Sequence, residues 1–380
     1  MFRKVNNWIH LWLGLISGVI MLIVCLTGAI WTFGDEIKFA IYGSVPISKG
    51  AKAVVLPSVI KQVIQHKYPG QPINTVFYKT ALPIEVIVKK WGDNPLLLHL
   101  DPFTGKILRE RLLEDRTTLF FYWIEGGHRN LWLPGWIGRP VANYGTLMFV
   151  VLLITGLVWW YPKKWNKSTS DKSFKIKWGA KWKRVNLDLH NVLGFYVMLI
   201  ALILSLTGMV YGIKWYSRGV YKVTTGVQLP DWSPPLSDTT KVNNRLSLDH
   251  VLDRVLVKTM KRYPDAQGFF YRMPDSTALK SAIDIEIYPD LKSTYKNANV
   301  CFDRHTLAEI QRPAHYATAY KDSAAGLKLR RMNYDLHVGQ ILGLPGKIIA
   351  FFACLIGASL PVTGFIVWYN RKFGKKKKKR

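Results

Sequence analysis

Hydrophobic residues are concentrated in four long stretches that contain almost no charge. The stretches are Leu11 to Phe33, Val141 to Tyr161, Leu193 to Ile213 and Ile348 to Tyr369. A helix needs about 20 apolar residues to cross about 30 Å of hydrocarbon, because it rises about 1.5 Å per residue. The pattern therefore predicts four transmembrane helices. The first stretch exceeds the apolar part of a cleaved signal peptide, about 7 to 15 residues, so we expect it to be retained.

Two long segments between these stretches have a mixed pattern of helix and strand. Residues 34–127 and 214–332 each open with an amphipathic helical pattern that ends in Tyr-Pro, and each continues with alternating apolar and polar residues. Each then reaches an aspartate turn, Asp101-Pro-Phe-Thr-Gly105 in the first segment and Asp303-Arg-His-Thr-Leu307 in the second. The second turn lacks the glycine that accepts a positive φ. The pattern predicts a small α+β domain that is present twice.

The positions of the positively charged residues indicate how the chain is oriented in the membrane. The chain has 53 Lys and Arg against 24 Asp and Glu, and much of the excess lies just outside the predicted helices. The basic groups are Arg3 and Lys4, nine Lys or Arg from Lys163 to Arg184, Arg371 and Lys372, and the run Lys375 to Arg380. Four alternately threaded helices bring these groups to one side, which the positive-inside rule assigns to the cytoplasm. We therefore expect contact with a lipid bilayer, and no nucleic-acid partner.

The resulting architecture is an α-helical membrane protein with both termini in the cytoplasm of a bacterium and two external domains in the periplasm. The expected parts are 1–33 (helix 1), 34–127 (first domain), 128–162 (helix 2 with a preceding His segment), 163–188 (basic loop), 189–213 (helix 3), 214–332 (second domain), 333–370 (helix 4 with a preceding His segment) and 371–380 (basic tail). Helix, external domain and helix form a unit that occurs twice, in the inner membrane.

One histidine and one Thr-Gly pair accompany each predicted helix. His10 precedes Thr27-Gly28 by 17 positions, and His190 precedes Thr207-Gly208 by the same 17. In the other class, His128 precedes Thr155-Gly156 by 27 positions and His337 precedes Thr363-Gly364 by 26. Such matched spacing in two classes supports an internal duplication.

The threading places these histidines in two pairs. His10 and His190 lie near the cytoplasmic face, whereas His128 and His337 lie near the external face. Two imidazoles from facing helices can hold a haem iron between them, so all four histidines are candidate metal ligands. The alternative is that each histidine is an interfacial residue that hydrogen-bonds at a helix start.

Arginines near the histidines fit a haem site as well. Haem carries two propionates, and guanidinium groups pair well with carboxylates. The candidate cofactor-binding arginines are Arg129, Arg184, Arg330 and Arg331. The alternative is that these arginines only anchor helix ends among lipid headgroups.

Other chemistry has less support in the sequence. The short cytoplasmic segments contain no Gly-rich phosphate loop, so we expect no nucleotide or flavin site there. Cys25 and Cys354 lie in predicted helices, which leaves Cys301 alone outside them. No disulfide is therefore expected within an external domain. The predicted spans also lack acidic residues, which argues against a proton-coupled carrier.

The four His and Thr-Gly helices and the Asp101-Pro-Phe-Thr-Gly105 turn resemble the PepSY-associated transmembrane family, which includes PiuB-like iron-regulated membrane proteins and FoxB-type siderophore reductases. The resemblance covers nearly the whole chain. It implies two PepSY-like external domains and an oxidoreductase that takes part in iron uptake. The second turn departs from the family pattern, because Leu307 stands where the glycine is expected.

The resemblance also implies the acceptor of the electrons. Two haems, expected to be b-type, would connect an unidentified cytoplasmic or membrane electron donor with a ferric siderophore in the periplasm, and iron(II) would be released. One alternative is a non-catalytic PepSY membrane protein that binds a peptide or a peptidase. Another is an accessory transport subunit.

Overall fold

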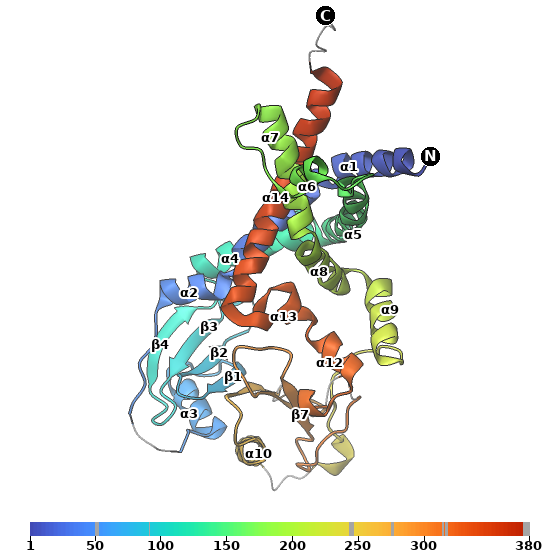
Figure 1. Cartoon of the computed structure of the whole chain (residues 1–380). Coiled ribbons are helices and arrows are strands. Elements are labelled where there is room, and N and C mark those ends of the chain that lie inside the picture. Colours follow the sequence, from blue (N-terminus) through green and yellow to red (C-terminus); the bar gives the residue numbers. More distant parts are fainter. Residues whose placement is uncertain are drawn as a thin grey trace, which may run out of the picture. The chain divides into compact units, whose positions relative to one another are not determined.

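The computed structural model describes residues 1–49, 53–90, 92–242, 247–274, 277–313, 315 and 318–374 (Figure 1). The expected basic run Lys375 to Arg380 lies outside these residues. The chain divides into two compact units. The helical unit comprises Met1–Ile37, Phe120–Val220 and Asn333–Arg380, and the sheet unit comprises Lys38–Leu119 and Tyr221–Met332.

The helical unit contains the apolar stretches of the sequence. Its helices are α1 (Phe2–Thr32), α5 (Gly135–Trp160), α6 (Lys167–Phe174), α7 (Trp182–Asp188), the π-helix η1 (Leu189–Leu193), α8 (Gly194–Gly212), α13 (Asn333–His337), the 3-10 helix η4 (Gln340–Leu342) and α14 (Gly343–Phe373). The helices α2 (Gly34–Tyr42), α4 (Arg116–Asn130) and α9 (Lys214–Thr225) lead from one unit to the other. In the part of the chain that the structure describes, four helical segments are long and apolar enough to cross a membrane, which confirms the expected number: Phe2–Thr32, Gly135–Trp160, Trp182–Gly212 and Gln340–Phe373.

All four segments begin before the apolar stretch that predicted them, and in two of them the earlier start changes where a histidine lies. The first starts at Phe2 instead of Leu11, and the third starts at Trp182 instead of Leu193. His10 and His190 therefore lie about two turns inside their helices, not at the helix starts. In these two helices, the residues between the helix start and the apolar stretch contain no proline, and helices propagate cooperatively once they are nucleated. The last seven residues of the expected basic loop 163–188 consequently belong to α7.

Small residues allow the long helices to approach one another. α1 packs against α5 and α14, and α8 packs against the same two helices. A Cβ atom added at Gly145 of α5 would lie 2.6 Å from Ile20 on α1, and one added at Gly18 of α1 would lie 3.3 Å from Pro361 on α14. Apolar side chains of α1, α5, α8 and α14 form the core between the helices. Close backbone approach of this kind is typical of helices that associate in a membrane.

The sheet unit contains one seven-stranded antiparallel sheet, whose strand order is β4-β3-β2-β1-β5-β6-β7. The strands are β1 (Ile73–Lys79), β2 (Ile84–Val88), β3 (Leu96–Leu100), β4 (Ile107–Leu112), β5 (Gly268–Arg272), β6 (Ile283–Tyr288) and β7 (Ala298–Phe302). The helices α3 (Pro57–Lys67) and α10 (Leu248–Arg262) share one hydrophobic core with it. The unit also contains the 3-10 helices η2 (Thr239–Lys241) and η3 (Tyr320–Asp322) and the helix α12 (Ala325–Arg331).

The two segments that were expected to form separate domains share this sheet. β1 from the first segment pairs antiparallel with β5 from the second, with Phe77 opposite Phe270. Each copy has a first strand whose backbone would otherwise be an unpaired edge, and pairing these edges satisfies their N–H and C=O groups. The expected pattern of helix, strands and turn is present in both segments, but the alternating pattern within one strand could not show which strand is its neighbour.

The two aspartate turns have the same hydrogen bonds. One carboxylate oxygen of Asp101 accepts from the backbone N–H groups of Phe103 and Thr104 at 3.0 and 2.9 Å, and the other accepts from Ser48 N–H at 2.7 Å. Asp303 accepts in the same way from the N–H groups at positions 305, 306 and 238. Burial of Asp101 opposes ionisation, but the hydrogen bonds from Ser48, Thr104 and Phe103 outweigh it and hold the pKa of its carboxyl well below the usual range.

The missing glycine does not change the second turn. Leu307 has a φ of 62°, which is close to the 73° of Gly105 in the first turn. In both turns this residue donates its N–H to the carbonyl of the aspartate, at 3.0 Å. A left-handed leucine costs roughly 1 kcal/mol or more relative to glycine. The aspartate turn is therefore preserved at some cost in the second copy.

Candidate metal-binding histidine pairs

The structure brings the four histidines together in the two expected pairs. The imidazole ring centres of His10 and His190 are 6.4 Å apart, with an angle of 80° between the ring planes. The ring centres of His128 and His337 are 6.0 Å apart, with an angle of 53°. All four residues belong to the helical unit. Each pair combines one histidine from residues 1–162 with one from residues 189–370, so neither part of the chain alone contains a complete pair.

Backbone carbonyls assign the proton of two of the rings. Nδ1 of His128 lies 2.9 Å from the carbonyl oxygen of Val24, and Nδ1 of His337 lies 2.9 Å from that of Leu204. A carbonyl oxygen can only accept, so Nδ1 carries the proton in both rings. Nε2 is then the nitrogen with a free lone pair, which is the form of histidine that binds a metal.

Threonine hydroxyls assign the proton in the other two rings. Nδ1 of His10 lies 2.9 Å from Oγ1 of Thr155, and Nδ1 of His190 lies 3.0 Å from Oγ1 of Thr363. Each hydroxyl already donates to a carbonyl one turn earlier in its own helix, at 2.9 Å in both cases. The hydroxyl oxygen is therefore left to accept from Nδ1–H, and Nε2 is again the basic nitrogen. We call His10 and His190 the inner pair and His128 and His337 the outer pair, after their expected positions. The inner pair thus has the same tautomer as the outer pair.

The glycine of each Thr-Gly pair provides the space in which a histidine ring lies. A Cβ atom at Gly28 would lie 3.1 Å from Cε1 of His128, and one at Gly208 would lie 2.9 Å from Cε1 of His337. The corresponding distances are 3.3 Å at Gly156 from His10 and 3.0 Å at Gly364 from His190. The Thr-Gly pair of one helix therefore holds the histidine that accompanies the other helix of the same repeat.

Three asparagines support the histidines, and the sequence interpretation missed them. The side chains of Asn6, Asn186 and Asn333 donate to the backbone carbonyls of Thr155, Thr363 and Thr207 at 3.1, 3.0 and 3.0 Å. All three asparagines are buried. Each stands four residues before a histidine of the pairs, so the signal in the sequence is Asn-x-x-x-His. His128 departs from it, because Ile124 occupies the matching position.

Local irregularities of the backbone accompany three of the histidines. His190 lies in the π-helix η1, which inserts one wide turn between α7 and α8. Leu131 and Trp132, shortly after His128, both have a φ of 56°, and Gly339, shortly after His337, has a φ of 76°. Such departures from regular helix occur frequently at functional sites.

A cavity of about 740 Å³ adjoins the inner pair. His10 and His190 line it, together with the indole rings of Trp159 and Trp160 and mainly apolar residues of α1, α5, α8 and α14. Its volume lies within the range of about 300 to 1,000 Å³ that is usual for ligand and cofactor sites. Arg371 and Lys372 at the end of α14 also line it. Both belong to the basic group after the fourth apolar stretch, although the sequence interpretation did not select them as ligand-binding residues.

The four arginines selected from the sequence lie in different environments. Arg129 forms an exposed ion pair with Glu125 at 2.6 Å, and Arg184 pairs with buried Asp188 at 2.7 Å. Arg330 and Arg331 belong to the sheet unit, where Arg331 donates to the carbonyl of Thr318 at 2.7 Å. Arg129, Arg184 and Arg331 bind other protein groups, and the role of all four arginines at a cofactor stays a prediction.

The histidine pairs are the main candidate site for a metal in the described part of the chain. Within that part no group of three or more His, Cys, Asp and Glu side chains is arranged to hold a metal ion. Other histidines have single partners: His99 lies 3.7 Å from Glu85, and Nε2 of His305 donates to the carbonyl of Leu279 at 3.0 Å. A pair of imidazoles is an incomplete set for a bare ion such as Zn²⁺, which usually needs four ligands.

A comparison with known protein families decides the identity of the chain. The PepSY-associated TM region family matches residues 7–371. The chain belongs to this family. Together with the four apolar helices, the match shows a multi-pass membrane protein of the PepSY-associated TM region family. No curated protein matches the chain.

Proposed function

We propose that this member of the PepSY-associated family is a haem-containing reductase that passes electrons across the bacterial inner membrane to a periplasmic ferric siderophore, from which iron(II) is released. The observation that carries the proposal is the arrangement of the two histidine pairs. All four rings have Nδ1 engaged as a donor and Nε2 as the basic nitrogen. Fixing the imidazole tautomer by hydrogen bonds at Nδ1 is the usual way in which proteins prepare a histidine ligand.

The distances between the rings would allow each pair to hold a haem iron between its two imidazoles. A bond of about 2 Å from Nε2 to a central metal, plus about 1 Å from Nε2 to the ring centre, places two opposed ring centres about 6 Å apart. The observed separations are 6.4 Å for His10 and His190 and 6.0 Å for His128 and His337. A haem, expected to be b-type, supplies one-electron chemistry when it is bound.

The cavity beside the inner pair also suits a haem. Its walls are mainly apolar, which excludes water from the region between the helices, and its aromatic side chains can pack against a flat ring. Arg371 and Lys372 provide cations for two carboxylates at one end. These two residues join Arg129, Arg184, Arg330 and Arg331 as candidates for binding the propionates.

The length of α1 relates the two pairs to the two faces of the membrane. His10 lies on α1, and His128 contacts Val24 of the same helix, 14 residues later. This spacing corresponds to about 21 Å along the helix axis, which is a large part of the roughly 30 Å of hydrocarbon. The basic end of the helical unit, which includes Arg3, Arg371 and Lys372, is assigned to the cytoplasm by the positive-inside rule. Electrons from an unidentified cytoplasmic or membrane donor would then enter at His10 and His190 and leave at His128 and His337.

Visible spectroscopy of the full chain tests the proposal. The protein is purified in mild detergent from haem-replete cells, and oxidised and dithionite-reduced spectra are recorded. We expect about two haems per chain and one fewer in His337→Ala, whereas the control His250→Ala, an exposed histidine of α10, retains both. A colourless protein would refute the proposal and favour a non-catalytic PepSY protein that binds a peptide or a peptidase.

The activity is tested separately from haem binding. The dithionite-reduced protein, freed of excess reductant, is mixed with ferric hydroxamate and ferric catecholate siderophores, and released iron(II) is trapped with a coloured chelator. We expect oxidation of the haem spectrum in step with iron(II) release. In inverted vesicles His10→Ala retains the outer haem but no longer supports reduction driven from the cytoplasmic side. Full activity of this variant would contradict the proposed direction of electron flow.

A further inference from the structure

The last turns of α4 and the residues that follow them have an exposed apolar surface. From Phe120 onward α4 belongs to the helical unit. The surface consists of Phe120, Tyr122, Trp123, Trp132 and Leu133, each of which is between 43% and 55% exposed. We call these five residues the α4 surface. A contiguous apolar surface is unfavourable in water and usually marks a site of interaction.

The rings of the α4 surface pack on one another. The ring centres of Phe120 and Trp123 are 6.5 Å apart, and those of Trp123 and Trp132 are 4.7 Å apart, with angles of 27° and 25° between the ring planes. Nε1 of Trp132 also donates to the backbone carbonyl of Trp123 at 2.8 Å. The rings therefore form one continuous surface that is fixed in the folded chain.

The buried face of α4 lies against a membrane-spanning helix. A Cβ atom added at Gly127 of α4 would lie 3.0 Å from the side chain of Thr27 on α1, and Nδ1 of His128 lies 2.9 Å from the carbonyl oxygen of Val24. Thr27 and Val24 belong to the apolar stretch of α1 that ends at Phe33, and Val24 precedes that end by nine residues, or about 14 Å along the helix axis. The end of α4 therefore lies beside the apolar part of α1, at membrane depth.

The turn between α4 and α5 satisfies its own backbone N–H groups. Leu131, Trp132 and Leu133 donate their N–H groups to carbonyls of α4 at 3.1, 3.3 and 3.0 Å, and Pro134 has no N–H group. Within a lipid leaflet every backbone N–H must be satisfied inside the protein, because hydrocarbon accepts no hydrogen bonds. The turn meets this requirement at the cost of left-handed backbone angles at Leu131 and Trp132.

The α4 surface continues into the outside of the next membrane-spanning helix. α5 begins at Gly135, two residues after Leu133. The exposed large apolar residues in the first part of α5 are Trp136, Ile137, Val141 and Tyr144. Trp and Tyr are enriched where acyl chains meet headgroups. The composition of the α4 surface and its continuity with α5 therefore both fit a lipid leaflet.

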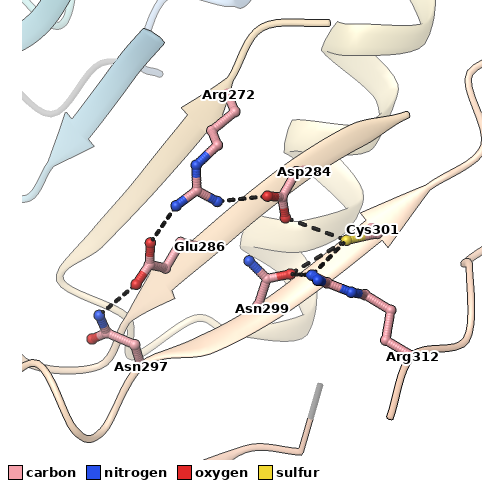
Figure 2. A network of polar contacts seen from close by, with 7 residues as sticks. All are labelled: Arg272, Asp284, Glu286, Asn297, Asn299, Cys301 and Arg312. Atoms are coloured by element: carbon pink, nitrogen blue, oxygen red, sulfur yellow. Dashed lines mark hydrogen bonds and ion pairs between the residues drawn. The ribbon is translucent and has the colours of Figure 1, made fainter. Parts of the chain in front are cut away.

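The exposed side of β5, β6 and β7 in the sheet unit has a different character (Figure 2). Arg272 donates to Asp284 at 2.5 Å and to Glu286 at 3.1 Å, and the thiol of Cys301 donates to Asp284 at 3.3 Å. Charged side chains of this kind are typical of a surface in water. Trp232, which is 66% exposed, lines the same cavity as these two carboxylates. It therefore serves as a control tryptophan in polar surroundings.

We propose that the α4 surface is embedded in the external leaflet of the bilayer, where its aromatic rings lie at the boundary between acyl chains and headgroups. α4 then enters the membrane from the external side, and the chain turns at residues 131–134 before α5 crosses. Lipid covers the side of α4 that faces away from α1, so His128 is shielded from water on that side. The proposal depends on the four spans and on the contacts of α4, and it does not depend on haem binding.

Fluorescent labels at single cysteines test this proposal. In a background in which Cys25, Cys301 and Cys354 are replaced by serine, the full-length variants Leu133→Cys and Trp232→Cys are labelled with an environment-sensitive dye. They are then reconstituted in vesicles of phosphatidylcholine and phosphatidylglycerol. We expect emission at shorter wavelength from Leu133→Cys than from Trp232→Cys. Lipids with a nitroxide near the headgroup end of the acyl chain should quench Leu133→Cys by about half and leave Trp232→Cys unchanged, because interfacial helices insert to this depth.

Two further labels give a second site and a depth scale. Tyr122→Cys, on α4 itself, should behave like Leu133→Cys. Ile154→Cys, which is 56% exposed within α5, should be quenched more by nitroxides near the end of the acyl chain. Labels at Tyr122→Cys and Leu133→Cys that resemble Trp232→Cys would overturn the proposal and place the α4 surface in water. Cross-linking of Leu133→Cys between two chains, without quenching by lipid, would overturn it in favour of contact with a second copy.

Discussion

At the residue scale, the histidines depend on groups that themselves have no reactive chemistry. A glycine gives each ring its space, and a threonine hydroxyl or a backbone carbonyl fixes its proton. In three of four cases an asparagine also donates to the backbone carbonyl of the threonine in the Thr-Gly pair. A ring with the other tautomer would carry its proton on Nε2, the nitrogen on which a metal needs a lone pair. Substitution of these supporting residues is therefore expected to affect cofactor binding even though none of them is a ligand.

The glycine of a Thr-Gly pair gives the sharpest test at this scale. In Gly208→Ala the new Cβ would lie 2.9 Å from Cε1 of His337, so the ring must move. We expect the outer haem to be lost from at least half of the molecules while the inner haem remains, as measured from the reduced spectrum. The strain should also lower stability by about 1 to 3 kcal/mol.

Gly219 provides a matched control, because it is a helical glycine of α9 whose Cβ would meet nothing within 4 Å. Gly219→Ala should retain both haems, and the better helix propensity of alanine should leave stability unchanged or raise it by up to about 1 kcal/mol. If both variants behave alike, the glycines do not serve the histidines.

A second prediction concerns the asparagine that stands four residues before a histidine. Asn186 is 1% exposed and donates to the carbonyl of Thr363, whose hydroxyl holds His190. Asn186→Ala leaves that carbonyl without this donor, and we expect a loss of about 1 to 3 kcal/mol in unfolding free energy. Thermal unfolding in detergent measures the loss. A shift of the inner haem's reduction potential, with the outer potential unchanged, would distinguish positioning of His190 from a general loss of stability.

At the element scale, the duplicated aspartate turn shows which part of a motif is required. The carboxylate and its N–H donors are the same in both copies, but the left-handed position holds glycine in one copy and leucine in the other. The carboxylate is therefore the essential part of the turn. The glycine only lowers the cost of the backbone conformation.

The loss of stability caused by removing the charge of Asp101 should depend on pH. Asp101→Asn is expected to destabilise the protein by about 2 kcal/mol at pH 7, because hydrogen bonds to a carboxylate are lost. The pKa of folded Asp101 is lowered, so its stabilising effect is complete above the unfolded pKa of about 4 and declines as the pH falls below it. The stability difference between wild type and variant should therefore narrow below about pH 4 in urea titrations. A difference that stays constant from pH 7 to pH 3 would contradict this account.

At the scale of the whole molecule, the basic groups at one end of the helical unit determine the expected orientation. A single cysteine introduced at Ser170 in α6, in a background in which Cys25, Cys301 and Cys354 are replaced by serine, should react with a membrane-impermeant maleimide only in inverted vesicles. A cysteine at Ser44 should react only from the opposite side. Labelling of both sites from the same side would refute the four-helix threading and the proposed direction of electron flow.

The sequence by itself determined the features that depend on local pattern. The lengths of the apolar stretches predicted four spans, and alternating residues predicted strands in both segments between the spans. The matched spacing of His10 with His190, and of His128 with His337, predicted two classes of histidine. These features follow from the periods of helix and strand and from the thickness of a bilayer. The family was also identified from them.

Only the tertiary structure decided how distant segments meet. It joined β1 and β5 in one sheet, placed each histidine over the glycine of another helix, and brought Asn6, Asn186 and Asn333 to the carbonyls of the Thr-Gly pairs. The residue pattern within one strand or helix does not identify the element that it contacts. Edge pairing and helix packing depend on surfaces that form only when the chain has folded.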